Sequence, residues 1–257
     1  MDPDPARGTV TAAELAGFFG ETLDAGRFAD YCPNGLQVEG TRPIARLVSG
    51  VTASLAFLRR AVEMQADAVL VHHGWFWRGE DPRVIGARRE RMRLVLGHGL
   101  ALFAYHLPLD AHPTLGNNAR LAAVMGWQID GRGGEHDLVF WHDLPAPVDA
   151  HDLAGSIEAA LHRTPLMVGA ARRPIRRIAW CTGAAHDWIG QAIALGADAY
   201  ISGEIAERTT HEAREAGIIY LAAGHHATER YGVQALGDHA AAHFGIEHRF
   251  VDDDNPV

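Results

Sequence analysis

Residues 46–74, RLVSGVTASLAFLRRAVEMQADAVLVHHG, and residues 177–204, RIAWCTGAAHDWIGQAIALGADAYISGE, match each other without a gap and decide the fold. In each copy an arginine leads a short apolar strand, an amphipathic helix follows, and an Asp-Ala pair opens a second strand. Arg46 precedes Asp67 by 21 residues, and the second copy keeps the same spacing. Alternating strands and amphipathic helices are typical of an α/β protein, and an internal repeat indicates duplication. We therefore predict two similar α/β halves.

The repeat continues into residues that bind metals. After its second strand the first copy has a histidine pair, where the second copy has Gly-Glu. After the next strand the two copies read HLPLD and HHATE, so each has a histidine followed four residues later by an acid: His106 with Asp110, and His225 with Glu229. We expect the first half to cover 1–126 and the second 127–257, with the C-terminal helix free to pack on the first half.

Composition limits the classes of function. The chain has 257 residues, is 47% hydrophobic and carries a net charge of −9 without a basic block, which argues against direct nucleic-acid binding. Neither a signal peptide nor an apolar run of about 20 residues is found, so we expect a cytoplasmic protein without a membrane partner. Cys32 and Cys181 form no CxxC pair, and we expect no thiolate metal site. Sixteen histidines are the unusual feature.

The repeated groups have the composition of a metal site. Each follows the predicted carboxyl end of a strand, where the loops of open α/β sheets converge on ligands, so we expect a metal cleft between the two halves. Imidazole and carboxylate suit Zn, Fe, Mn, Co or Ni. Six such ligands are too many for one catalytic ion that keeps an open position, and they suit two divalent ions of a hydrolase. The predicted ligands are His72, His73, His106, Asp110, His225 and Glu229.

Simpler interpretations exist for each group taken alone. The histidine pair could be a hydrogen-bonding loop, and His106 with Asp110 could be a turn that Pro108 fixes. His225 and Glu229 could mark only the start of a helix, and His226 is also within reach of Glu229. Residues 30–40, DYCPNGLQVEG, read as simple turn chemistry around Pro-Asn-Gly. The aromatic run WFWRG, residues 75–79, is either core or a wall for a planar substrate.

Four stretches in order resemble one protein family. DYCPNGLQVEG, VLVHHGWFWRG, YHLPLDAHPTLGNNARLA and SGE…GHHATERYGVQAL are similar to the motifs of the Nif-three-like family, whose members are also labelled homologues of type 2 GTP cyclohydrolase I. The resemblance covers essentially the whole chain. It implies two α/β halves around a dinuclear metal centre held by the six ligands above, and a homohexameric ring.

The resemblance also implies an activity. A cyclohydrolase of this type would use a metal-bound hydroxide to open the guanine imidazole ring of GTP and release formate. Glu204 and His226 are the candidate catalytic proton carriers, and Arg78 or Arg230 would hold the triphosphate, since no GxxxxGK[ST] loop is found. Two alternatives stay open: a phosphodiesterase or amidase with the same centre, and a non-enzymatic metal-binding scaffold or regulatory interaction protein.

Overall fold

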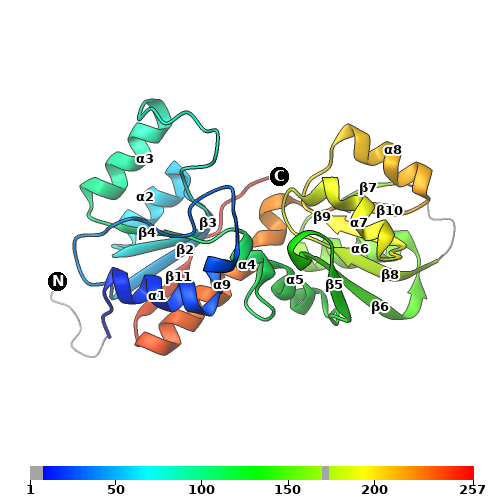
Figure 1. The fold of residues 1–257 in the computed structure, drawn as a ribbon, viewed down its shortest axis with the longest axis horizontal. Coiled ribbons are helices and arrows are strands. Elements are labelled where there is room, and N and C mark those ends of the chain that lie inside the picture. Colours follow the sequence, from blue (N-terminus) through cyan, green and yellow to red (C-terminus); the bar gives the residue numbers. More distant parts are fainter. Residues whose placement is uncertain (1–7, 170–173) are drawn as a thin grey trace. The chain divides into compact units, whose positions relative to one another are not determined.

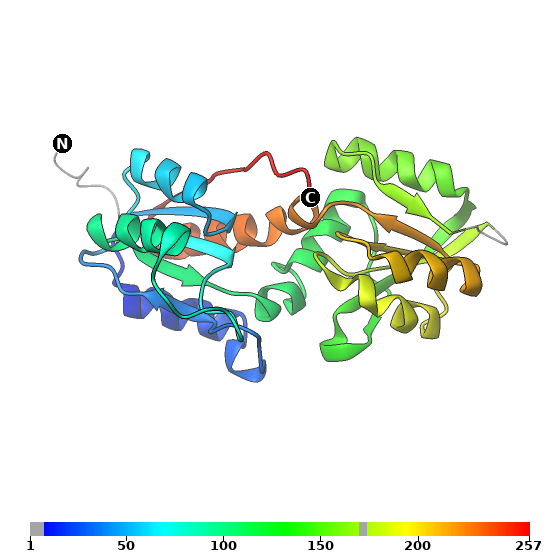
Figure 2. The ribbon, with the colours of Figure 1, turned by 90° about the horizontal axis from the view of Figure 1, so that it is seen from above.

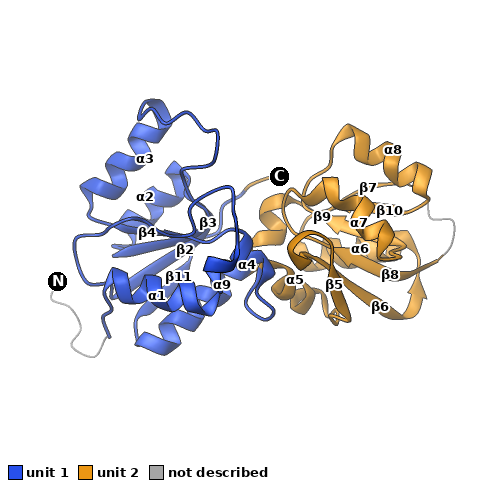
Figure 3. Ribbon diagram, viewed as in Figure 1, with its two compact units in different colours: residues 1–116, 232–254 blue, residues 117–231, 255–257 orange. Residues whose placement is uncertain are grey.

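The computed structural model describes residues 8–169 and 174–257, and it consists of two compact α/β units (Figures 1 and 3). Unit 1 comprises Met1–Gly116 and Gly232–Asp254, and unit 2 comprises Asn117–Tyr231 and Asn255–Val257. The predicted class, α/β with two similar halves, is confirmed. The sequence pattern predicts a division after residue 126. The structure divides the chain ten residues earlier because the helix that starts at Asn117 packs in the core of unit 2, and it divides the chain again inside the C-terminal helix.

The sheet of unit 1 has the strand order β1-β4-β3-β2-β11, in which only β1 is antiparallel to its neighbour. Helices cover both faces. Helices α1 and α9 lie on one face, and α2 and α3 lie on the other (Figures 1 and 2). Their leucine and phenylalanine side chains belong to two separate buried clusters, one on each face. The elements are β1 (Gly35–Val38), β2 (Arg46–Thr52), β3 (Ala68–His73), β4 (Ala101–Ala104), β11 (Glu247–Phe250), α1 (Ala12–Thr22), η1 (Ala25–Arg27), α2 (Leu55–Glu63), α3 (Gly86–Gly97), α4 (Leu107–Ala111) and the later part of α9 (His225–Phe244).

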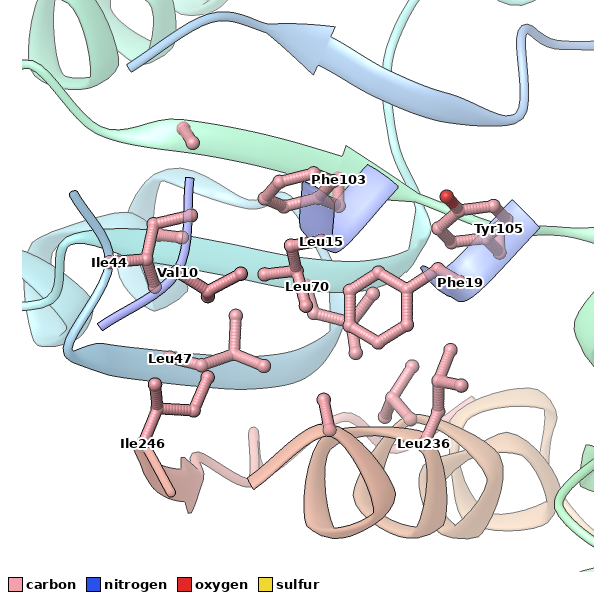
Figure 4. Close-up of a cluster of buried hydrophobic side chains, with 14 of the residues drawn as sticks. Val10, Leu15, Phe19, Ile44, Leu47, Leu70, Phe103, Tyr105, Leu236 and Ile246 are labelled. Carbon is pink, nitrogen blue, oxygen red and sulfur yellow. The ribbon is translucent and has the colours of Figure 1, made fainter. Parts of the chain in front are cut away.

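Alternation along the strands creates the two cores of unit 1. Successive strand residues point to opposite faces, so Leu70 and Phe103 pack in one cluster while Val69 and Leu102 pack in the other. Figure 4 shows the first cluster, where α9 contributes Leu236 against the strands. Two helices of unit 1 start with a side-chain cap: Thr11 and Glu14 form a capping box at α1, and Ser54 caps α2.

The sheet of unit 2 repeats this arrangement. Its order is β5-β6-β8-β9-β10-β7, with β8, β9 and β10 parallel, as β2, β3 and β4 are in unit 1. An antiparallel strand, β7, flanks β10 as β1 flanks β4. The elements are β5 (Gly131–Gly133), β6 (Val139–Val148), β7 (Leu166–Val168), β8 (Ile175–Trp180), β9 (Ala199–Ser202), β10 (Ile219–Ala222), α5 (Asn117–Met125), η2 (Glu135–Asp137), α6 (Ala150–Leu161), η3 (Ala185–Trp188), α7 (Ile189–Ala194), α8 (Glu207–Ala216) and the first turns of α9.

The repeated Arg-Asp spacing has a structural cause. The Asp67 carboxylate accepts the N–H of Arg46 at 2.9 Å, and the Asp198 carboxylate accepts the N–H of Arg177 at 3.0 Å. Each arginine side chain donates to a carbonyl that directly follows the intervening helix, at 2.8 Å in both units. The pair therefore fastens the start of the first strand to the start of the second. The helices of residues 8–169 and 174–257 include none long and apolar enough to cross a membrane.

Candidate metal centre

Three histidines come together at the carboxyl end of the sheet in unit 1. His72 and His73 end β3, and His106 follows β4, the parallel neighbour of β3. One ring nitrogen of each lies within 4.8 Å of the others. Asp110, in α4, places its Oδ1 3.5 Å from Nε2 of His72, and Thr52 hydrogen-bonds Nδ1 of His73 at 3.1 Å. The structure thus brings together all four ligands predicted in the first half.

Hydrogen bonds at Nδ1 fix the tautomers of two of these rings. Nδ1 of His72 donates to the carbonyl of Tyr105 at 2.9 Å, and Nδ1 of His106 donates to Oδ1 of Asp30 at 2.8 Å. Both partners can only accept, so the proton of the neutral ring must be on Nδ1 and the lone pair on Nε2. A histidine held in this way is prepared to bind a metal through Nε2. The donor set of unit 1 therefore fits a transition-metal ion.

Asp30 orients His106 from a stretch that sequence analysis interpreted as a simple turn. Its Oδ2 accepts hydrogen bonds from Asn34 Nδ2 and from the N–H of Leu107, each at 2.9 Å, while Asn34 Oδ1 accepts the N–H of His106 at 2.7 Å. Burial would raise the pKa of Asp30, but hydrogen bonds and charge from His106, with the other donors, lower it to about 2. The sequence contains one signal for this orienting role, an acidic residue close to a Pro-Asn-Gly turn, because binding residues often lie on loops.

Unit 2 holds the second histidine-carboxylate pair. His225 starts α9, and Nε2 of its ring lies 3.0 Å from Oε2 of Glu229 one turn later, while Nδ1 lies 2.6 Å from Oε1 of Glu204. Burial would lower the pKa of His225, but Glu229 and Glu204 outweigh it and raise the pKa to about 9. The contact gives Glu204 an orienting role like that of Asp30. Its predicted role as a proton carrier stays a prediction.

A glycine leaves the space that this pair occupies. Gly183 follows β8 with φ +69°, and a Cβ added there would lie 1.9 Å from Oε1 of Glu229 and 3.1 Å from Nε2 of His225. Its N–H donates to the Thr228 hydroxyl at 3.1 Å, and its carbonyl accepts the N–H of Gly203 at 2.8 Å. Gly183 therefore joins the ends of β8 and β9 to the start of α9. The sequence pattern does not predict this role for Gly183.

Three other predicted site residues make main-chain contacts. The N–H of buried His226 donates to the carbonyl of Val257 at 3.0 Å. Of the two arginines predicted to hold triphosphate, the exposed Arg78 donates to the carbonyl of Asp30 at 3.1 Å, and the partly buried Arg230 donates to a carbonyl at the end of α6, also at 3.1 Å. Arg78 therefore lies beside Asp30, the residue that orients His106.

The aromatic run after His73 is divided between the core and the histidines, and its predicted role as a wall for a planar substrate stays a prediction. Trp75 is buried in the core, and its indole N–H donates to the carbonyl of Ala53 at 3.2 Å. The ring of Trp77 instead lies against His106, with centroids 5.0 Å apart, and Phe76 is 41% exposed. One of the three residues is therefore core, and one borders the histidines.

Comparisons with known proteins agree with this architecture. A sequence model of the family described as Duf34/NIF3 (NGG1p interacting factor 3) matches residues 10–256. The Pseudomonas aeruginosa protein named GTP cyclohydrolase 1 type 2 homolog is 55% identical over 238 residues, which are 91% of this chain and 94% of that protein. The Escherichia coli K12 protein of the same name is 47% identical over 95% of this chain and 98% of its own length.

Solved structures give the same result. One described as protein ybgI, of unknown function, has a TM-score of 0.93 and 45% identity, and the match covers 96% of this chain and 100% of that chain. TTHA1606 from Thermus thermophilus has a TM-score of 0.88 and 30% identity over the same shares of the two chains. At 18% identity, reduced HcgD from Methanocaldococcus jannaschii shares the fold, with a TM-score of 0.82.

Proposed function

This chain belongs to the Duf34/NIF3 family, and we propose that it is a metal-dependent hydrolase with a dinuclear centre. The observation that carries the proposal is the hydrogen bonding of the histidines: His72, His106 and His225 each face an acceptor through Nδ1, so the neutral ring carries its lone pair on Nε2, the nitrogen that would bind a metal. Two divalent ions of Zn, Fe, Mn, Co or Ni would be held by His72, His73, His106, Asp110, His225 and Glu229.

The ligand types support hydrolysis. Imidazole and carboxylate leave the ions able to act as Lewis acids, and two such ions lower the pKa of a water and stabilise charge that develops on a substrate oxygen. Asp30 and Glu204 accept hydrogen bonds from Nδ1 of His106 and His225, and these contacts would orient Nε2 of each ring for a metal. Glu204 and His226 are proposed to carry protons in the reaction.

The proposed substrate is a small nucleotide or other planar heterocycle. Two aromatic rings border His106: Trp77 at 5.0 Å and the 52% exposed Tyr31 at 6.4 Å between centroids. Such rings stack well on a planar base. The exposed Arg78, whose guanidinium donates to the carbonyl of Asp30, would bind a phosphate of the substrate. The printed name of the relatives makes GTP the first substrate to test, with ring opening and release of formate as the reaction.

The test starts with the metal. Purified protein is stripped with a chelator and loaded separately with Zn²⁺, Mn²⁺ and Fe²⁺, and bound metal per chain is measured for the wild type, His106→Ala and His225→Ala. His211→Ala is the control, because His211 is 60% exposed on α8. We expect two ions in the wild type and the control, and fewer in both site variants. Unchanged metal content in the site variants would contradict the dinuclear centre.

Activity is tested next on the same samples. Formate release from GTP that requires metal and is lost in His106→Ala and His225→Ala would support the cyclohydrolase reaction. Bound metal without formate from any loaded form would refute ring opening of GTP, and phosphodiester and amide substrates would follow. If the protein turns over none of them, and metal removal dissociates the proposed homohexamer in light scattering, the ions act as a scaffold.

A further inference from the structure

Cys32 lies beside Asp30 and His106, two side chains that can also bind a metal. Of these three residues, the proposed dinuclear centre uses only His106 as a ligand. Its side chain is 7% exposed, and Sγ, a carboxylate oxygen of Asp30 and a ring nitrogen of His106 lie within 4.8 Å of one another. The sequence predicts no thiolate ligand, because neither cysteine has a partner cysteine nearby in the chain. The fold instead brings one cysteine to a histidine and an aspartate.

The carboxylate is held so that one oxygen faces this cluster. Asp30 Oδ2 is fixed by the N–H groups of Asn34 and Leu107. Oδ1 accepts the N–H of Tyr31 at 2.6 Å and lies 2.8 Å from Nδ1 of His106. A proton lies between Oδ1 and Nδ1 in the ion-free protein. A divalent ion can replace that proton without disturbing the hydrogen bonds at Oδ2.

We propose that Asp30, Cys32 and His106 form a second cation site, which takes thiophilic divalent ions such as Zn²⁺ or Cd²⁺. One sulfur, one nitrogen and one oxygen ligand are a mixed donor set that zinc accepts, with a fourth position for water. The thiolate makes the site selective, because Mn²⁺ and Mg²⁺ prefer oxygen ligands. Binding releases the thiol proton of Cys32 to solvent, since only the thiolate coordinates a metal.

An ion in the second site would compete with the proposed dinuclear centre for the imidazole of His106. When an ion occupies Nδ1 of His106, the ring proton moves to Nε2, and the ring can no longer join His72 and His73 in holding another ion. Excess thiophilic metal would therefore inhibit by taking His106. This competition rests on the proposed function, whereas the site itself does not.

The experiment is a titration of chelator-stripped full-length protein with Cd²⁺ alone, followed by ultraviolet absorption for the cadmium-thiolate charge-transfer band. The variants are Cys32→Ser and the matched control Cys181→Ser, because these two buried cysteines are the only thiols in the chain. We expect the band in the wild type and in Cys181→Ser, and its loss in Cys32→Ser. A band that persists in Cys32→Ser, or that is missing from the wild type, overturns the proposal.

Two further measurements cover the remaining outcomes. If Cys32→Ser fails to fold by circular dichroism, X-ray absorption of the zinc-loaded wild type decides: a sulfur neighbour at about 2.3 Å supports the site, and nitrogen and oxygen neighbours alone refute it. Mn²⁺ uptake separates the two proposals, because Cys32→Ser should bind Mn²⁺ as the wild type does. Failure of the dinuclear centre would appear as missing Mn²⁺ in the wild type, with the cadmium band unaffected.

Discussion

Replacing Gly183 with alanine should weaken metal binding while the fold survives. The new Cβ would lie 1.9 Å from Oε1 of Glu229, whereas real Cβ contacts essentially never fall below 3.0 Å, so the carboxylate must move by more than about 1 Å. The clashing atom ends a flexible side chain, which makes this movement cheap for the fold. A metal ligand, however, tolerates displacements of only about 0.2 Å.

The expected loss follows from this geometry. Disturbing the residues that orient ligands typically costs about 10–100-fold in metal affinity, or about 1.4–2.8 kcal/mol, and we expect at least this for Gly183→Ala. Alanine is strained in the folded state at this positive φ, which lowers the free energy of unfolding by about 1–3 kcal/mol. Gly196→Ala is the control, because Gly196 has φ +77° and its Cβ would meet only Arg177 Nη1, at an ordinary 3.7 Å.

The assay pairs two measurements on the same proteins. Zn²⁺ affinity is obtained by competition with a chromophoric chelator, and the free energy of unfolding is obtained from urea denaturation of metal-free protein. Both variants should lose stability from the left-handed strain, but only Gly183→Ala should lose affinity. Equal zinc affinities in the two variants would refute the reasoning, because the Glu229 carboxylate would then not be a ligand that Gly183 positions.

Further predictions concern groups around the sites. Asp30→Asn should weaken Zn²⁺ binding about 10–100-fold in the chelator assay. Because the pKa of Asp30 is lowered to about 2, this carboxylate contributes about 2 kcal/mol to the free energy of unfolding above pH 3.8, and the contribution is lost toward pH 2. The free energy of unfolding in urea should therefore depend less on pH in the variant across this range. In the ion-free protein the raised pKa of His225 stabilises the fold below about pH 6.5, and this contribution is lost as pH rises through about 9. Metal must displace that proton, so the zinc affinity of the wild type should rise about tenfold per pH unit up to about pH 9. In Glu204→Gln the affinity should level off at a lower pH. Identical pH profiles of zinc affinity in the two proteins would contradict this. Asp198→Ala should cost about 1–3 kcal/mol in urea denaturation, because two N–H groups lose their acceptor, with zinc affinity unchanged.

Local patterns in the sequence predicted the parts of the fold that depend on local interactions. Apolar runs and amphipathic helices showed the strand-helix-strand repeat, and the shared spacing from Arg46 to Asp67 marked a real contact. The carboxyl ends of parallel neighbours meet at one edge, so the histidines of β3 and β4 were expected together, and they are.

Long-range contacts between polar side chains were not predictable in this way. Asp30 is far from His106 in the chain, and nothing in a Pro-Asn-Gly turn specifies which side chain it will meet. Gly183 was missed because a glycine after a strand is common, and its value lies in the space it leaves for Glu229. Cys32 was judged by its lack of a partner cysteine, although a metal site needs only convergent ligands of suitable chemistry.

The division of the chain inside α9 has a consequence for synthesis on the ribosome. Unit 1 begins first, but it lacks β11, the neighbour of β2, and the core residues Val233, Leu236 and Ala240 until residues 232–254 emerge. Unit 2 is almost complete once residue 231 has been made. Domains tend to fold as their segments emerge, so the nascent first unit must wait with an open sheet edge and an uncovered apolar face while the second unit closes. The half that starts first is the half that finishes last.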